Sequence, residues 1–105
     1  MTGTWHITEM DMWDQEYFNA ERQAYIRIRK GGTGDFQFGL VTGDIDGHVE
    51  TIDSGPRFSF TWEGSDEMDP VSGSGWLRPI GEKKAEGMIK IHHGDRSRLL
   101  ARRAP

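Results

Sequence analysis

The chain has no cysteine, only four prolines and no long hydrophobic run. Without cysteine it can form neither disulfide bonds nor thiolate metal sites, and nothing points to an oxidising compartment. No stretch of about 18 apolar residues is present, and the N-terminal residues show no basic segment followed by an apolar one, which argues against a membrane-spanning helix and a secretory signal. We therefore expect a cytoplasmic protein with no membrane partner.

Motifs of nucleophilic and nucleotide chemistry are also missing. There is no Gly-x-Ser-x-Gly elbow and no Walker or dinucleotide glycine pattern that opens a helix. The glycine-rich segment 31–35 has no helical pattern after it, so it indicates a turn rather than a phosphate cradle. The sequence favours binding over catalysis and predicts no cofactor.

Basic residues are absent from residues 1–21, which carry five acids, and residues 35–69 have nine acids against one base, Arg57. Residues 71–105 reverse this balance, with eight bases against three acids. The net charge of −4 disfavours nucleic acid as the main partner, although the basic tail can touch phosphate locally. We expect the acidic and basic segments to interleave in a sheet and pair across strands.

Residues 1–105 suit a single domain, since folded domains most often have about 100–150 residues. Alternation of apolar and polar residues with period two dominates the chain, as in strands with one buried face. Leu40 and Trp62 are expected to extend two of these inward faces. The ten residues predicted to be buried are Trp5, Ile7, Ile26, Ile28, Phe36, Phe38, Phe58, Phe60, Ile89 and Ile91.

Turn signals recur at roughly 8–12-residue spacing, which is typical of all-β barrels and sandwiches. The predicted turns are residues 31–35, 43–47, 53–56, 81–83 and 94–95. With residues 73–79 as a glycine-weakened strand, we predict an all-β fold, a small antiparallel up-and-down barrel of about eight strands.

One segment, residues 14–21, breaks the alternation. Its acids suit a helix N-terminus, and Trp13, Tyr17 and Ala20 recur at helical spacing. We predict a short helix that joins the first two strands and covers one end of the barrel with Trp13, Tyr17 and Phe18.

The segment Gly3-Thr4-Trp5 resembles the Gly-x-Trp start of lipocalins and avidins, where the Trp closes one end of an up-and-down barrel. Residues 3–7, 60–69 and 89–95 are similar to a group of small uncharacterised bacterial all-β proteins. The bacterial group has no assigned activity, so it implies no function. The calycin similarity implies a small-molecule ligand, which enters between the helix and the barrel rim.

The sharpest local feature is a run of acids, predicted to lie on a loop that leaves a strand: Glu63, Asp66, Glu67 and Asp69. Clustered carboxylates can bind a hard cation, meet a basic protein surface, or bond nearby backbone amides in a solvated loop. Trp62 and Trp76 flank this run, so an aromatic binding mouth beside the acids is an alternative to packing in the core.

Metal sites have weaker support. Residues 42–53 match an EF-hand loop only at Asp44, Asp46, Gly47 and Asp53, and the flanks read as strands, so we predict a hairpin turn at Asp46-Gly47. His92 and His93 would point to opposite faces of a strand. A zinc site could in principle combine His93 and Asp95 with His6 and His48, but the spacing of these residues in the sequence does not indicate one.

These features predict a non-catalytic binding or regulatory module that contacts a basic protein partner. The alternatives are a small-molecule binder of calycin type and a hydrolase or metal enzyme built on carboxylates such as Glu63 and Asp66. The large aromatic side chains are expected to fill the interior and leave no ligand-sized hole. The predicted contact residues are Trp13, Tyr17, Trp62, Glu63, Asp66, Glu67, Asp69 and Trp76.

Overall fold

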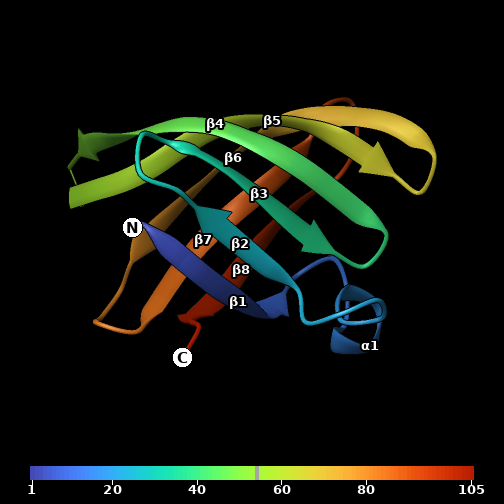
Figure 1. The fold of residues 1–105 in the computed structure, drawn as a ribbon, viewed down its shortest axis with the longest axis horizontal. Coiled ribbons are helices and arrows are strands. Elements are labelled where there is room, and N and C mark those ends of the chain that lie inside the picture. Colours follow the sequence, from blue (N-terminus) through green and yellow to red (C-terminus); the bar gives the residue numbers. More distant parts are fainter. Residues whose placement is uncertain (54) are drawn as a thin grey trace.

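The computed structural model describes residues 1–53 and 55–105, and its eight antiparallel strands close into one barrel (Figure 1). The strands are β1 (Gly3–Met10), β2 (Tyr25–Ile28), β3 (Thr33–Phe38), β4 (Val41–Ile52), β5 (Gly55–Asp66), β6 (Asp69–Pro79), β7 (Lys84–Ile91) and β8 (Arg96–Arg103). Each strand pairs with its neighbours in sequence, and β8 returns to pair with β1. The predicted up-and-down barrel is therefore confirmed, including the glycine-rich sixth strand.

The inward side chains form one hydrophobic core, as the period-two pattern predicts. Trp62 is also buried, and the partly buried Ile91 packs against this core. Leu40 was assigned wrongly, because the chain already reverses at Gly39–Leu40 and leaves Leu40 37% exposed. The predicted residues that are at most 5% exposed are Trp5, Ile7, Ile26, Ile28, Phe36, Phe38, Phe58, Phe60 and Ile89.

The predicted turn at residues 43–47 is wrong, because these residues lie in the long strand β4. A Cβ atom on Gly43 would lie 2.6 Å from the ring of Phe36, and one on Gly47 would lie 2.7 Å from the rings and side chains of Phe58 and Phe60. These glycines make room for core aromatics and do not mark a chain reversal. The turns predicted near residues 81–83 and 94–95 are confirmed.

Two other predicted turns need adjustment. The turn after β2 lies earlier than predicted, since Thr33, Gly34 and Asp35 already belong to β3. In the turn predicted at 53–56, residue 54 lies outside the described residues, Asp53 is in a turn and Gly55 begins β5.

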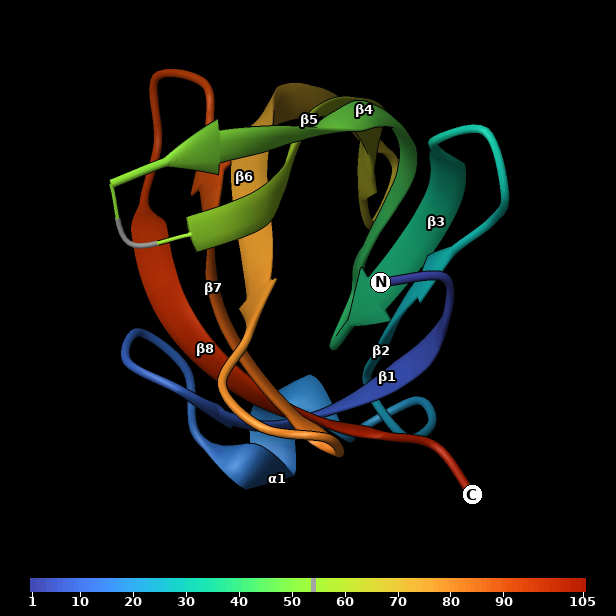
Figure 2. The same ribbon diagram turned by 90° about the vertical axis from the view of Figure 1, so that its left-hand side faces the viewer.

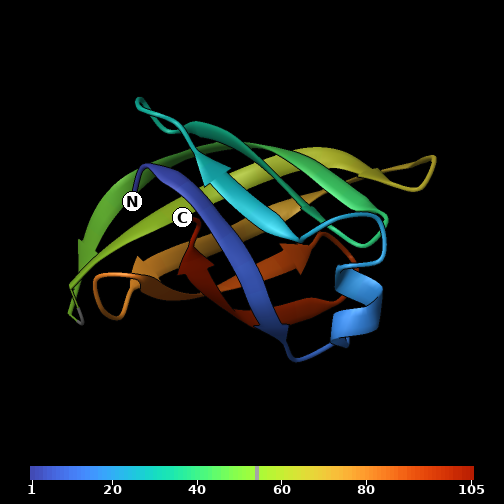
Figure 3. The ribbon, with the colours of Figure 1, turned by 60° about the horizontal axis from the view of Figure 1, so that its bottom comes forward.

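The predicted short helix is present as α1 (Gln15–Phe18), between β1 and β2 at one end of the barrel (Figure 3). The carboxylate of Asp14 caps it by accepting the Tyr17 N–H at 3.0 Å. Asn19 ends it, so the helix is shorter than the predicted 14–21. Within the described residues, no helix is long and apolar enough to cross a membrane.

Side chains occupy the space between α1 and the barrel rim. Phe18 is 2% exposed and belongs to the core. The ring of Trp13 lies 4.8 Å from that of Phe38, centroid to centroid, and Tyr17 packs over Gly39. This end of the barrel is therefore covered by packed aromatic side chains, where the calycin alternative places ligand entry.

Trp5 lies near the start of β1, towards the opposite end from α1. Its indole Nε1–H donates to the carbonyl of Met1 at 3.0 Å, and the Arg103 guanidinium lies 4.4 Å from the ring centroid. Arg103 also donates from Nη1 to the carbonyl of Thr2 at 3.0 Å. The first and last strands are thus fastened together around one buried Trp.

Candidate functional site

The acidic segment 35–69 and the end of the basic tail lie on different walls of the barrel, whereas the acidic N-terminal segment lies beside the tail because β1 pairs with β8. Strands β4 and β8 lie on opposite sides of the barrel (Figure 2), four places apart in the closed strand order. The expected pairing of acidic with basic segments occurs where β1 meets β8 and where β5 meets β6, whereas the other strands pair within their own segment because up-and-down order places sequence neighbours side by side. The Lys/Arg ion pairs of the described residues join β2 or the residue just after it to β3, β4 to β5, and β6 to β7: Arg27–Asp35, Arg29–Asp35, Arg57–Glu50 and Arg78–Glu86.

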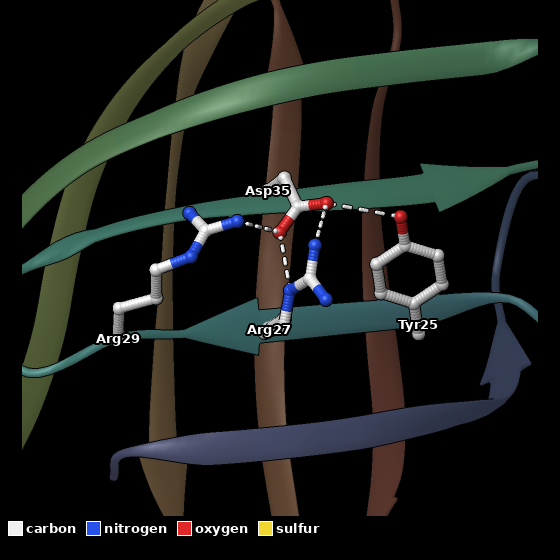
Figure 4. Close-up of polar contacts among 4 residues, drawn as sticks. All are labelled: Tyr25, Arg27, Arg29 and Asp35. Atoms are coloured by element: carbon white, nitrogen blue, oxygen red, sulfur yellow. Dashed lines mark hydrogen bonds and ion pairs between the residues drawn. The ribbon is translucent and has the colours of Figure 1, made fainter.

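On the outer face of β3, Asp35 is the centre of a polar cluster (Figure 4). Arg27 donates to its two carboxylate oxygens from Nε at 2.8 Å and Nη2 at 2.9 Å, Arg29 from Nη2 at 3.2 Å, and the Tyr25 hydroxyl at 3.0 Å. Partial burial acts to raise the pKa of Asp35, but these hydrogen bonds and the two arginine charges outweigh it and hold the pKa below its usual range. Burial, and then the bond to Asp35, raises the pKa of Tyr25.

We expect Asp35→Asn to lower the free energy of unfolding at pH 7 by on the order of 1–3 kcal/mol, because it removes the negative charge and replaces one of the two acceptor oxygens by an amide group that donates. A carboxyl with a lowered folded-state pKa stabilises the fold above its unfolded pKa, and that contribution disappears as pH falls through the folded value. The stability gap between wild type and variant, measured by urea unfolding, should therefore close below about pH 4.

Tyr25→Phe is the matched variant, since it removes one donor and keeps the ion pairs. It should cost about 0.5–1.5 kcal/mol. Because the folded-state pKa of Tyr25 is raised, its contribution is lost as pH rises above about 10, where wild type and Tyr25→Phe should converge. If the difference in unfolding free energy between wild type and Asp35→Asn does not change from pH 7 to pH 3, the ionised carboxylate of Asp35 is not the cause of the stabilisation.

Next to this cluster lies an open groove of about 680 Å³ on the outer face of β4–β7. We call this face the acidic wall, because Asp44, Asp46 and Glu63 lie on it. Asp44 lies directly opposite both Asp35 and Glu63, and Glu63 lies opposite Ser72. Small residues of this face, Thr61, Ser72, Gly73 and Ser74, are among those that line the groove. The groove is lined by Asp44, Ile45, Asp46, Thr61, Trp62, Glu63, Ser72, Gly73, Ser74, Lys90 and His92.

The carboxylates of this groove differ from Asp35, which has two arginine partners. Of the described residues, none forms an ion pair with Asp44, Asp46 or Glu63. Like charges placed directly opposite each other across strands destabilise a sheet. The pair Asp44–Glu63 therefore breaks a local rule of sheet stability without a compensating contact, and such places are expected at functional surfaces.

Of the residues predicted from sequence, Glu63 and Trp62 line this groove. The Trp62 ring faces inward, 3% exposed, and Nε1–H donates to the carbonyls of Ser74 and Lys90 at 3.3 and 3.2 Å. Trp76 lies on the outer face, with the Arg57 guanidinium 5.3 Å from its ring. The two indoles are on opposite faces of the sheet, so the aromatic mouth suggested by the sequence does not form.

The predicted acidic loop at residues 63–69 is instead a tight hairpin. Residues through Asp66 belong to β5, Asp69 begins β6, and the turn is Glu67–Met68. Asp66 and Asp69 face each other directly, and Met68 at the tip is 93% exposed. Glu63 and Asp66 are three positions apart on one strand, so they point to opposite faces and do not form a carboxylate pair for hydrolysis.

The remaining predicted residues lie at the α1 end of the barrel. Tyr17 packs over Gly39, and the neighbouring Leu40 accepts the backbone N–H of Glu67 at 3.0 Å. The Gly39–Leu40 turn therefore joins the aromatic end around Trp13 and Tyr17 to the acidic hairpin, but neither residue lines the groove.

The histidines do not gather into a site. His93 has a positive φ of 62° in the turn after β7, and its ring lies 4.0 Å from that of His92, so the expected opposite orientation is wrong. His48 lies beside Glu50 on β4, and His6 lies on β1. Across residues 1–53 and 55–105, no three His, Asp or Glu side chains are placed to hold a metal ion. The EF-hand match is part of an extended strand, which cannot wrap around a cation.

Comparisons of this chain with protein-family models, curated proteins and solved structures found no match. The residues themselves must therefore carry the functional assignment. In the sequence, Asp44 and Asp46 match only a calcium loop or a turn, and their place beside Glu63 was not predicted. A pattern that indicates this placement is present in the sequence. Gly43, Ile45 and Gly47 alternate with the two aspartates, as in a strand that carries both aspartates on one face.

Proposed function

We propose that this barrel is a non-catalytic binding module whose acidic groove contacts a basic surface of a protein partner. The observation that carries the proposal is the pair Asp44–Glu63, two carboxylates directly opposite each other with no ion-pair partner among the described residues. A lysine or arginine from a partner would relieve this repulsion on binding. Asp46 in the same groove adds a third carboxylate.

Two further features support a protein partner. The groove is open and its floor consists of small polar side chains, which suits an extended segment of another chain more than an enclosed small molecule. The acidic hairpin, residues 66–69, adds further carboxylates at the end of β5 and β6. Negative potential over such an area accelerates encounter with a basic partner.

The test uses a short lysine-rich peptide as the probe. The variant Asp44→Asn/Asp46→Asn/Glu63→Gln should slow its association with the barrel by about tenfold at low salt, because surface charge acts mainly on the encounter rate. The dependence of this rate on ionic strength should also weaken. Stopped-flow fluorescence measures both quantities, and circular dichroism checks that the fold is intact.

The matched control Glu9→Gln/Glu16→Gln/Glu21→Gln removes the same charge from exposed positions on β1 and around α1. It should change the association rate less than twofold. Equal effects of the two triple variants would refute a localised site. A third variant, Asp66→Asn/Glu67→Gln/Asp69→Asn, measures how much the hairpin charges contribute to the association rate. Micromolar calcium or zinc binding in calorimetry, abolished by a groove or hairpin variant, would replace the proposal with a metal site.

A further inference from the structure

A second groove lies on the basic wall, away from the acidic one. It has a volume of about 420 Å³ and opens between the outer face of β1, the end of β8 and the turn before β7. The described residues that line it include no Asp or Glu. They are His6, Thr8, Gln23, Lys83, Arg102, Arg103, Ala104 and Pro105.

Hydrogen bonds to main-chain carbonyls hold the walls of this cationic groove in place. The N–H of Arg103 donates to the carbonyl of Lys83 at 2.8 Å, which fixes the turn before β7 beside β8. The N–H of Ala104 donates to the carbonyl of Thr4 at 2.9 Å, and the side-chain amide Nε2 of Gln23 donates to the carbonyl of Ile7 at 3.2 Å. The groove is therefore formed before any ligand binds, so a ligand would not have to order it.

As on the acidic wall, side chains of like charge lie directly opposite each other on neighbouring strands, but here the charges are positive. Arg102 on β8 lies directly opposite His6 on β1 and Lys84 on β7. Among the described residues, no carboxylate forms an ion pair with Lys83, Lys84 or Arg102. A sheet gains nothing from two cations that face each other, whereas a bound anion would offset their repulsion.

We propose that this groove binds the phosphate group of a small phosphorylated molecule. Arg102 and Lys83 supply the charge, and guanidinium groups suit the several acceptor oxygens of a phosphate. Ala104, Pro105 and the methyl group of Thr8 give the same groove an apolar part that can cover the organic portion of the ligand. The volume lies in the range of small-molecule sites.

The test is a titration of the ¹⁵N-labelled chain with phenyl phosphate, followed by amide chemical shifts. Affinity should be on the order of millimolar for a ligand of this size. Shifts should concentrate at Thr8, Gln23, Lys83 and residues 102–104. Inorganic phosphate should bind at the same amides but more weakly, because it does not use the apolar part of the groove.

Arg102→Gln and Lys83→Gln should each weaken binding of phenyl phosphate by about tenfold, the size expected for a lost charge-assisted hydrogen bond. The control Arg96→Gln removes the same charge from the same strand outside the groove and should change affinity less than twofold. Equal weakening by Arg96→Gln would show diffuse charge attraction and overturn the proposal. Equal chemical-shift changes with phenol would also overturn the proposal. So would a result in which phenyl phosphate does not bind, while vesicles of phosphatidylglycerol bind in a way that depends on Arg102.

Discussion

Phe60→Ala should lower the free energy of unfolding by about 3–5 kcal/mol, as large-to-small changes in a core do. Phe60 is 5% exposed, and its ring lies 5.8 Å from that of Phe58. A Cβ on Gly75 would lie 2.6 Å from the Phe60 ring, so the ring rests on a glycine. Because the glycine has no side chain to move into the vacated space, the cavity should stay open, which favours the upper part of the range.

Urea unfolding followed by Trp fluorescence measures this loss. The control is Thr61→Ala, the next residue, whose side chain points outward and which should change stability by no more than about 0.5 kcal/mol. A loss below about 1 kcal/mol for Phe60→Ala would show that the inner face of β5 is assigned wrongly.

Trp5→Ala is the second substitution with a large expected effect, again about 3–5 kcal/mol. Trp5 is 1% exposed, and its loss removes the bond from its indole to Met1 and the ring beneath Arg103. The barrel should open first between β1 and β8, where these contacts lie. Hydrogen exchange of the amides that pair β1 with β8 should therefore rise more than exchange between β4 and β5.

Trp5→Phe separates the two contributions, because it keeps an aromatic ring and removes the Nε1–H. We expect it to cost less than Trp5→Ala while still exceeding about 1 kcal/mol, from the lost hydrogen bond and the smaller ring. If Trp5→Ala instead leaves exchange between β1 and β8 unchanged, this Trp does not fasten the two strands together.

The barrel could be predicted from sequence because each strand carries its own period-two pattern, and because an up-and-down order needs only local connections. The errors arose where glycine has two uses. Gly43 and Gly47 resemble turn residues, but they lie in β4 because Phe36, Phe58 and Phe60 need the space that a side chain would fill. Only knowledge of which strands face each other across the core can distinguish these cases.

The candidate site was harder to predict, because strand register decides it. Glu63 stood out in the sequence as part of an acidic run, yet the run contributes to two places, the groove and the hairpin. Its neighbour in the groove, Asp44, is 19 positions away in the chain and becomes adjacent only through the β4–β5 pairing. In the same way, Arg102 faces His6 only because the barrel closes.

Because acids concentrate on β4 and β5 and bases on the opposite strand β8, we expect the molecule to have an electric dipole moment, although its net charge is only −4. A dipolar protein turns in the field of a charged surface before contact, so it approaches either sign with the matching wall forward. The same molecule should be retained at low ionic strength on both anion and cation exchangers near neutral pH. Salt should release it from both, as the Debye length falls below the distance between the two walls.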